Sequence, residues 1–510
     1  MISIWRKSIM ASSSEDVKGV LLVESTQSNV SLHELCVYTH IISCAKQLLP
    51  VFINRIGQAS TLKEVLPRYF EKYQIVEDVK LSAGSRLWLF VISAALWLYQ
   101  FFRRDLVSLH WRGELVGDIV YDQYLAGSQK GTVDYLDGRL VKYIYITLRA
   151  VERDRRLLEK IKPAAVLLSH RVGLNSAPLA VLCQQQSIPM YSFGGGEYGT
   201  MIVSQTRKSY EYRTTVADLE PLLNLPQQEF DGIFESIQQE LFKGSYNADS
   251  KLAFANKLFS DRQAFASTFC LDAAKKNIFV MLHAFTDYPH SHFNGMLFAD
   301  FLDWFLETLE FASRHKNVNW IFKQHPSAHF YPVVDVDWDA LVRKYTSGNL
   351  IFMPQGVDFD SRSIGHVGDA TITCLGSAGF EFGALARIPT ITAGDNPYVE
   401  AGFAIYPQTR AGYFDVLKNL DTLPKLDDEA FKKAKATFMF IHRLSRVPMH
   451  AFLNLSHAES RELQHGDAYF AKIDAHAEEY EELIAIELRK YIAVVGAPGF
   501  SALRSSPQEY

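Results

Sequence analysis

The sequence has 510 residues, of which 48% are hydrophobic and 21% are charged. These proportions are those of an ordinary globular protein, and they exclude intrinsic disorder, collagen and coiled coil as descriptions of the whole chain. The 52 Lys and Arg residues against 57 Asp and Glu residues give a net charge of −5, so no overall basic field attracts nucleic acid. A chain of this length predicts two large domains.

The N-terminal segment, residues 1–19, carries charges within its short apolar start, which is not typical of a secretory signal peptide. The five cysteines are scattered along the chain, and no two of them form a Cys-x-x-Cys pair. This pattern argues against a disulfide framework and a zinc ribbon, and it favours a reducing compartment. We therefore expect a cytoplasmic location.

Residues 87–102 form an apolar run of sixteen residues without a charge, preceded by Arg86 and followed by Arg103 and Arg104. A helix needs about 20 residues to span a bilayer, so this run is short for that purpose. We favour a fully buried core helix. The alternative is a helix lying against a membrane, since the arginines, two Trp and one Tyr suit the interface. That alternative predicts peripheral contact with the inner face of the cytoplasmic membrane.

The first half of the chain contains one strand–helix–strand pattern. Residues 30–125 are predicted to be mostly helical, and a first α/β block is predicted over about 110–220. Its last strand runs into Gly194-Gly195-Gly196, a turn that is typical of a βαβ unit. The expected elements are a helix over 139–160, a strand over 164–168, a helix over 175–186 and a strand over 188–193.

The second half alternates strands and helices more regularly. Residues 220–275 are predicted to be helical and to connect the halves, and the chain is helical again from 427. Between these segments we expect strands over 277–283, 318–323, 350–353, 370–374 and 389–392, with helices over 296–314 and 380–386.

These elements predict two doubly wound, Rossmann-like α/β domains that face a cleft, with extra helices at both ends of the chain. A cleft between two such domains is a natural ligand site. The expected domains are an N-terminal α/β domain with a helical extension over 1–245, a second α/β domain over 246–425, and C-terminal helices over 426–510 that pack back.

A small-residue turn follows the strand expected at 370–374. It consists of Gly376, Ser377, Ala378 and Gly379, and it opens a helix whose free N–H groups and dipole attract phosphate. Ser377 can cap that helix or donate to a phosphate oxygen. Glu381 lies one turn later and can accept hydrogen bonds from ribose hydroxyls. The alternative is an ordinary capped helix.

A second turn, Lys323-Gln324-His325-Pro326, ends the strand expected at 318–323. Ligands bind at this edge of open α/β sheets. His325 can hydrogen-bond a phosphate, Lys323 can supply charge and Pro326 can fix the turn. Alone, a His-Pro pair more often marks a structural turn. Two such turns in one domain favour a nucleotide site.

The loop after the strand expected at 277–283 is rich in polar groups. It contains His283, Thr286, Asp287, His290 and His292, whose spacing matches no zinc motif. We interpret the loop as lining for a donor site, with His283 on the donor side, and we expect no metal.

A transfer to an acceptor hydroxyl needs a base near the acceptor. The candidates in the first half of the chain are Asp118, Asp122, His170 and Glu197. Each of them can equally be a turn or capping residue, and the sequence does not decide among them.

Four segments together resemble bacterial capsule and surface-polysaccharide glycosyltransferases of the GT-B fold, in particular capsular Kdo transferases. They are KQHP at 323–326, CLGSAGFEFGALARIPTI at 374–391, GDIVYDQYL at 117–125 and the stretch from Ser169 to Gly199. Bacterial sialyltransferases with CMP-sugar donors and teichoic-acid glycerophosphotransferases have comparable elements. The resemblance covers about 110–410, and the order and spacing of all four segments carry it.

The resemblance implies that the C-terminal domain binds a nucleotide-sugar, with His325 and Ser377 on the donor phosphate and Glu381 on the ribose. The N-terminal domain would bind a glycan or lipid-linked glycan acceptor. The nucleotide-sugar is then a substrate, and neither a cofactor nor a metal is expected. CMP-Kdo, another CMP-sugar, and UDP- or GDP-sugars remain open as donors. The alternatives are a sugar-nucleotide epimerase on the same fold and a non-catalytic partner that binds glycan or an export machine.

Overall fold

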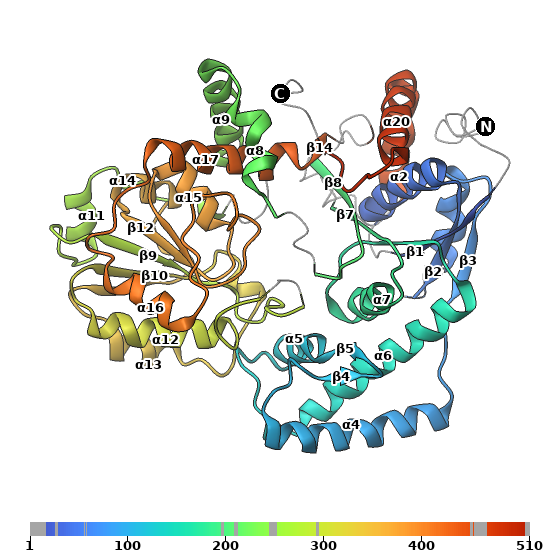
Figure 1. Ribbon diagram of the computed structural model, residues 1–510, viewed down its shortest axis with the longest axis horizontal. Coiled ribbons are helices and arrows are strands. Elements are labelled where there is room, and N and C mark those ends of the chain that lie inside the picture. Colours follow the sequence, from blue (N-terminus) through green and yellow to red (C-terminus); the bar gives the residue numbers. More distant parts are fainter. Residues whose placement is uncertain are drawn as a thin grey trace. The chain divides into compact units, whose positions relative to one another are not determined.

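A computed structural model describes residues 17–25, 29–55, 57, 59–194, 198–208, 213–243, 252–254, 256–291, 295–448, 452 and 467–504. The chain forms two compact units, each an α/β structure (Figure 1). Unit 1 contains Met1–Val120, Leu140–Glu211 and Arg443–Ser505. Unit 2 contains Tyr121–Arg139, Tyr212–His442 and Ser506–Tyr510.

Unit 1 is built on a seven-stranded sheet with the order β14-β8-β7-β6-β1-β2-β3. The five strands from β7 to β3 are parallel, while β8 and β14 run antiparallel to their neighbours. The chain therefore starts in the sheet, moves outward through β2 and β3, and returns to the other side of β1, which is the Rossmann-type path. The strands are β1 (Gly19–Glu24), β2 (Leu48–Asn54), β3 (Gln74–Glu77), β6 (Ala165–Leu168), β7 (Met190–Gly194), β8 (Tyr198–Ser204) and β14 (Val447–Pro448).

Helices from both ends of the chain enclose the core of unit 1. Buried residues of α2, α19 and α20 pack with those of β1 and β2 in one cluster, so the C-terminal helices belong to this unit. A small hairpin, β4 (His110–Trp111) and β5 (Glu114–Leu115), stands apart from the main sheet. The helices are α2 (Asn29–Lys46), α3 (Ala59–Val65), α4 (Ala83–Arg103), α6 (Arg139–Ile161), α7 (Gly173–Gln185), α19 (Asp467–Glu479) and α20 (Glu481–Gly496).

The first three strands lie outside the α/β block that we predicted over 110–220. Strands β2 and β3 fall in the segment predicted to be mostly helical, so that prediction is wrong there. Parallel strands are buried on both faces and read as continuous apolar runs, which periodicity does not separate from buried helices. The run Leu48–Asn54, with one partly buried residue among six buried ones, is such a case.

Unit 2 is built on a five-stranded, wholly parallel sheet with the order β11-β10-β9-β12-β13. The path runs from β9 outward to β11 and then to the other side of β9, so the strand order reverses between β9 and β12 while all strands stay parallel. All five strands were predicted. They are β9 (Asn277–Met281), β10 (Asn319–Lys323), β11 (Leu350–Met353), β12 (Ala370–Thr373) and β13 (Thr390–Thr392).

Helices cover both faces of this sheet (Figure 1). On one face, buried residues of α11, α14 and α15 pack with Phe279 and Ile321 of the strands. On the other, Phe305 of α12 packs against Phe322, with ring centroids 5.8 Å apart. The helices of unit 2 are α8 (Val216–Leu223), α9 (Gln227–Phe242), α11 (Arg262–Thr268), α12 (Phe301–Arg314), α13 (Trp338–Tyr345), α14 (Ile364–Val367), α15 (Ala378–Ala386), α16 (Arg410–Lys418) and α17 (Asp428–Met439).

The unit boundaries differ from the predicted ones at 245 and 425. Helices α8 and α9 belong to unit 2, because both pack against α17. The segment from Tyr121 to Arg139 also belongs to unit 2, so the boundary falls inside helix α5 (Gly117–Ser128). Contacts between residues far apart in the sequence determine these unit boundaries. No change in amino-acid composition along the sequence marks their positions.

Helix α12 begins five residues later than predicted. Met296 forms a β-bridge with Gly394, and the Leu297 N–H donates to the Ala393 carbonyl. These residues therefore pair with the segment that follows β13, and the helix begins only after them. Asp300 then caps the helix by accepting from the Asp303 N–H at 2.8 Å. An Asp at the N-cap satisfies a helix-end donor.

Helix α4 contains the apolar run 87–102, and the favoured prediction of a buried core helix is wrong for it. Only Leu89, Ser93 and Gln100 of α4 are buried. Among the residues that the structure describes, α4 is the one helix long and apolar enough to cross a membrane, judged by length and composition.

Candidate functional site

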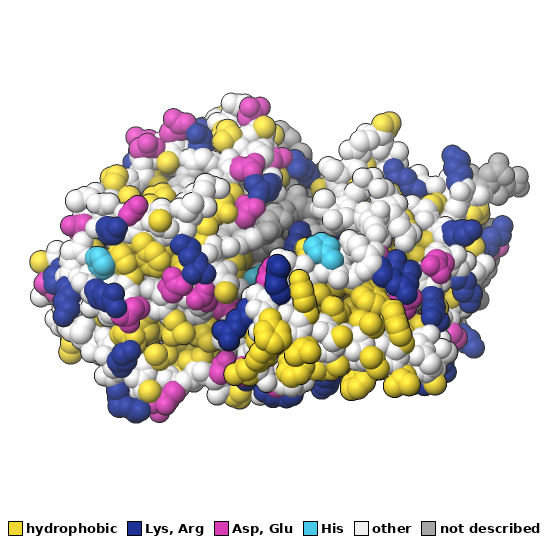
Figure 2. Space-filling model, turned by 60° about the horizontal axis from the view of Figure 1, so that its bottom comes forward, with side chains coloured by type: hydrophobic (Ala, Val, Ile, Leu, Met, Phe, Trp, Pro, Cys, Tyr) yellow, Lys and Arg dark blue, Asp and Glu magenta, His cyan; other side chains and the backbone are white. Residues whose placement is uncertain are grey.

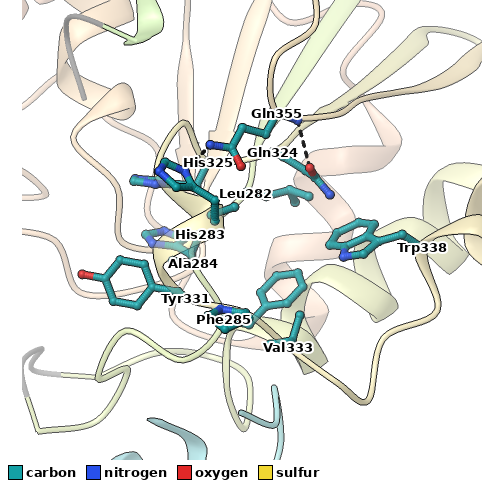
Figure 3. A pocket seen from close by; sticks show the side chains of 13 residues that line it. Leu282, His283, Ala284, Phe285, Gln324, His325, Tyr331, Val333, Trp338 and Gln355 are labelled. Atoms are coloured by element: carbon teal, nitrogen blue, oxygen red, sulfur yellow. Dashed lines mark hydrogen bonds between the residues drawn. The ribbon is translucent and has the colours of Figure 1, made fainter. Parts of the chain in front are cut away.

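A cavity of about 270 Å³ opens in unit 2 at the carboxyl ends of β9, β10 and β11 (Figure 3). Its walls come from the loops that follow these strands and from the start of α13. In open α/β sheets, ligands bind outside the carboxyl ends of the strands, beside the point where strand order reverses. The polar lining residues are His283, Gln324, His325, His329 and Gln355, and the aromatic ones are Phe285, Tyr331 and Trp338.

His283 connects this cavity to the turn after β12. Its Nε2 accepts from the Leu375 N–H at 2.9 Å, and its ring stacks on Phe301 with centroids 4.1 Å apart. Burial, and to a lesser extent the charge of His325, lowers the pKa of His283 to about 3. The ring is therefore neutral near pH 7 and, since Nε2 accepts, it carries its proton on Nδ1.

A neutral, partly buried His283 makes the stability of unit 2 sensitive to acid. An unfolded histidine titrates near pH 6.5, whereas folded His283 titrates near 3, so stability is lost as pH falls between these values, by about 1.4 kcal/mol per pH unit. In urea unfolding, the stability advantage of wild type over His283→Gln should shrink by about 2 kcal/mol between about pH 7 and pH 5.

The exposed His366 supplies the control for this prediction. His366→Gln should track wild type at both pH values, because the side chain lies on the surface of α14. An unchanged gap between wild type and His283→Gln would mean that His283 does not stay neutral in the folded protein.

The turn after β10 places His325 at the cavity. His325 Nδ1 accepts from the Ser327 N–H at 3.2 Å. Gln355, which follows β11, holds the turn from the other side, because its backbone N–H donates to Gln324 Oε1 at 2.9 Å (Figure 3). Its side-chain Nε2 donates to the Pro326 carbonyl at 2.6 Å. Backbone and amide groups thus fix His325, as a ligand-binding turn requires.

Lys323 and Pro326 do not line the cavity. Lys323 is the last residue of β10 and is buried, and burial lowers its pKa to about 8 although Asp360 opposes that shift. Pro326 contributes its carbonyl to the turn, as described above. The cavity lining therefore gives no support for the predicted role of Lys323 in donor binding, and that role stays a prediction.

One wall of the cavity is flat and aromatic. Phe285 stacks on Trp338 with centroids 5.8 Å apart and planes 15° apart, and on Phe305 with planes 24° apart. Stacked rings of this kind offer a face to a planar or ring-shaped ligand group. Signals for these residues in the sequence are weak, because only the fold brings the loop after β9 beside the start of α13.

The small-residue turn after β12 has the expected strand-to-helix position. Ser377 is exposed and has helical backbone angles. Its hydroxyl accepts no capping hydrogen bond from the first turn of α15. The Gly376 N–H donates to Thr373 Oγ1 at 3.1 Å. Ala378 begins the helix beside them.

Gly379 is a packing residue in this turn. A Cβ atom there would lie 2.1 Å from the Tyr398 hydroxyl and 2.9 Å from Thr390 Cγ2. Tyr398 is buried and donates from its hydroxyl to the Gly376 carbonyl at 2.7 Å. The glycine therefore lets α15 approach Tyr398. The predicted contact of this turn with a donor phosphate stays a prediction.

Glu381 lies in the first turn of α15 and is partly buried. Its Oε1 lies 3.8 Å from Nε2 of the buried His442. This contact is made within unit 2, and the predicted contact of Glu381 with ribose stays a prediction.

The histidine-rich loop after β9 does not gather its ligand-type groups. His290 Nε2 bonds the Ala299 carbonyl at 2.7 Å, and Asp287 lies on the surface. His292 lies outside the described residues. Within the described part of the chain, no group of three or more His, Cys, Asp or Glu side chains could hold a metal ion.

The two aspartates of α5 have separate structural partners. Asp118 is buried and pairs with Arg207 and, at 2.9 Å, with Lys208. Burial alone would raise its pKa, but the two cations outweigh burial and lower it. Asp122 is fully buried and accepts from the Ser291 N–H at 2.6 Å and Oγ at 2.5 Å. Neither arrangement leaves a carboxylate suited to accept a proton from a substrate.

His170 and Glu197 complete the set of base candidates. His170 follows β6, at the carboxyl edge of the sheet in unit 1, and its side chain is exposed. Glu197 lies outside the described residues. His170 is thus the candidate that the described structure leaves accessible.

A buried charged cluster at the same edge of unit 1 was missed in the sequence. Glu24 ends β1 and accepts from Ser176 Oγ at 2.6 Å, and Arg55, just after β2, pairs with Asp154 at 2.8 Å. Burial raises the pKa of Glu24, and the charge of Arg55 opposes that rise. The sequence does contain a signal for this cluster, because a charged residue stands at or just after the end of each apolar run, at Glu24 and Arg55. The signal is visible only when these runs are recognised as the strands β1 and β2.

The chain thus has two Rossmann-like α/β units, which is the fold class expected from the sequence. No family model matches the sequence, and no curated protein matches it significantly. Solved structures show only a remote likeness.

KpsC of Thermosulfurimonas dismutans, a beta Kdo 2,4 transferase, is 14% identical over 54% of this chain and 79% of its own, with a TM-score of 0.32. A UDP-GlcNAc 2-epimerase from Neisseria meningitidis, bound to UDP-GlcNAc, is 10% identical over 83% of this chain and 99% of its own, with a TM-score of 0.26. The glycosyltransferase SsfS6 of Streptomyces sp. SF2575, complexed with thymidine diphosphate, is 11% identical over 83% and 96%, with a TM-score of 0.24.

Proposed function

We propose that the protein is a glycosyltransferase that moves a sugar from a nucleotide-activated donor to a glycan acceptor in bacterial surface-polysaccharide synthesis. Unit 2 would hold the donor. The observation that supports this most is the cavity at the carboxyl edge of the parallel sheet, joined through His283 to the turn that opens α15. The motifs with the family resemblance, at 323–326 and 374–391, flank that edge.

The chemistry of this edge suits a nucleoside phosphate. The start of α15 directs helix N–H groups and the positive dipole end toward it, and the exposed Ser377 hydroxyl lies beside them. His325 approaches from β10 and can donate from Nε2, because its Nδ1 accepts from the chain. Such fixed donors stabilise a phosphate that departs with negative charge.

The size of the cavity limits what it can receive. Ligand pockets for whole drug-sized molecules begin at about 300 Å³, and this cavity has about 270 Å³. It therefore fits one ring of the donor, and its aromatic wall suits the flat base or the sugar ring. The remainder of the donor would extend toward α15.

A binding experiment tests this assignment. Melting temperatures of the full chain would be measured with CMP, CDP, UDP, GDP and ADP, for wild type, His325→Ala and Ser377→Ala. We expect one nucleotide to stabilise wild type by about 3 kcal/mol at one hundred times its Kd. Each variant should lose about tenfold in affinity, as loss of a hydrogen bond to a charged group does.

His366→Ala and Ser267→Ala are the matched controls, since both side chains are exposed on other helices of unit 2. Both should bind the nucleotide as wild type does. Absence of any stabilisation would refute the donor site and leave the non-catalytic glycan-binding or export partner as the explanation. Equal binding by His325→Ala and wild type would move the donor away from this cavity.

Turnover separates the two enzymatic alternatives. With the matching nucleotide-sugar, a glycosyltransferase should release nucleotide in proportion to added glycan acceptor. Conversion of the nucleotide-sugar to an isomer without acceptor would instead identify a sugar-nucleotide epimerase. His170→Ala should lower the acceptor-dependent rate without changing nucleotide affinity if His170 is the base.

A further inference from the structure

Helix α4 presents a large apolar surface that unit 1 does not cover. Seven large hydrophobic side chains on this helix are at least 46% exposed. Figure 2 shows hydrophobic side chains gathered in one continuous area along the edge where Figure 1 places α4. Monomeric proteins rarely leave a patch of this kind without a partner. The seven are Leu87, Trp88, Phe90, Val91, Leu98, Tyr99 and Phe102.

The exposed and the buried residues lie on opposite sides of α4. Leu87, Val91, Leu98 and Phe102 recur at intervals of four and seven, so at 3.6 residues per turn they form one stripe along the helix. The buried residues Leu89, Ser93 and Gln100 lie about half a turn away, facing unit 1. The apolar stripe therefore runs the length of the helix on its outer side.

Aromatic contacts on the flanks of the apolar stripe hold the first half of α4 against the rest of unit 1. Trp88 packs on Trp111 of β4 with centroids 5.5 Å apart, and Phe90 packs edge-on against Tyr145 of α6 at 6.0 Å. Near the other end, Gln100 is buried on the same side of the helix as Leu89 and Ser93. A helix held in this way cannot cross a bilayer without leaving these contacts, but it can lie on the surface of one.

Charged residues at both ends of α4 indicate the kind of surface to which the helix would bind. Arg86, Arg103 and Arg104 are exposed, and Asp105 is the one acidic residue among positions 83–105. The Arg103 guanidinium lies 5.8 Å from the centroid of Tyr99, next to the apolar stripe. Arginines beside exposed Trp and Tyr match the boundary between acyl chains and anionic headgroups.

We propose that α4 is an in-plane docking helix that attaches the protein to an anionic lipid bilayer. The apolar stripe enters the boundary between headgroups and acyl chains, and the three arginines contact the headgroups. Docking requires neither nucleotide nor acceptor, so the inference stands independently of the proposed function. It would bring unit 1 to the membrane, where a lipid-linked acceptor is found.

Vesicle flotation of the full chain tests the inference. Vesicles of phosphatidylcholine alone would be compared with vesicles that also contain phosphatidylglycerol, at low and high salt. We expect wild type to float with the anionic vesicles, and Leu98→Ser/Phe102→Ser to lose about tenfold or more in vesicle affinity. Arg103→Gln/Arg104→Gln should lose the preference for phosphatidylglycerol and most of the salt dependence.

A matched control lies on another helix of unit 1. Leu483→Ser/Ile486→Ser replaces two side chains of α20 that are 45% and 53% exposed, and it should float as wild type does. Melting temperatures of all variants should stay close to wild type, because only exposed residues are changed. If Leu98→Ser/Phe102→Ser floats like wild type, or wild type fails to float, the inference is overturned.

Two further outcomes would assign the stripe differently. Resistance of the bound protein to an alkaline carbonate wash would show insertion across the bilayer and contradict an in-plane helix. A dimer in solution that Leu98→Ser/Phe102→Ser converts to a monomer, without vesicle binding by wild type, would assign the stripe to a second copy of the chain. Release by the wash together with salt-sensitive flotation supports the proposal.

Discussion

A methyl group at Gly117 is expected to destabilise unit 1 by about 3 kcal/mol or more, at the upper end of the overpacking range. A Cβ atom there would lie 1.9 Å from the Leu106 carbonyl oxygen and 2.6 Å from both the Leu109 nitrogen and the Val107 oxygen. All three are backbone atoms, which cannot rotate away as a side chain does. Chemical unfolding of Gly117→Ala measures the loss.

Gly84→Ala is the control, because no atom lies within 4 Å of the added methyl group in the first turn of α4. It should be neutral or slightly stabilising, by up to about 1 kcal/mol. If Gly117→Ala is as stable as Gly84→Ala, the segment before α5 does not pack as closely as the structure shows. The position also matters for packing, because the buried Asp118, which pairs with Arg207 and Lys208, follows directly.

Gly379→Ala is expected to weaken nucleotide binding about tenfold or more and to cost about 2 kcal/mol of stability in unit 2. The added Cβ displaces the Tyr398 hydroxyl, which then releases the Gly376 carbonyl and shifts the turn that opens α15. Titration of the nucleotide found in the binding screen measures the first effect, and urea unfolding measures the second.

The double variant Gly379→Ala/Tyr398→Phe separates packing from direct contact. Removing the hydroxyl relieves the closest clash, so the double variant should regain part of the stability that Gly379→Ala loses. Gly365→Ala, whose nearest neighbour lies 3.9 Å away, should behave as wild type. A loss of affinity in Gly379→Ala without any loss of stability would instead indicate that the nucleotide contacts this glycine directly.

The parallel sheet of unit 2 could be predicted because its signals are local. Strands such as β11, over Leu350–Met353, are short apolar runs bounded by turn residues, and helices with polar outer faces separate them. The carboxyl ends of parallel strands share one edge, so the turns at Lys323 and Gly376 were both predicted at the ligand-binding edge of one domain. The structure brings both turns to that edge.

The residues that complete the candidate site could not be predicted in the same way. Gln355 and Trp338 follow no recognised motif, and they reach the cavity because β11 and α13 pack beside β10. Lys323 ends the predicted strand as expected, yet its side chain is buried near Asp360. A strand pattern in the sequence shows which side chains point to the same face of the sheet. Segments distant in the sequence pack on that face and determine whether those side chains are buried.

The sequence by itself determined the α/β class, the strands of unit 2 and the placement of its two turns, because periodicity and turn chemistry act over a few residues. Tertiary structure decided that Asp118 and Asp122 serve as partners of Arg207 and Ser291, that Gly379 makes room for Tyr398, and that α4 stays exposed. Burial and ion pairing depend on residues far apart in the chain, and only the folded chain brings them together.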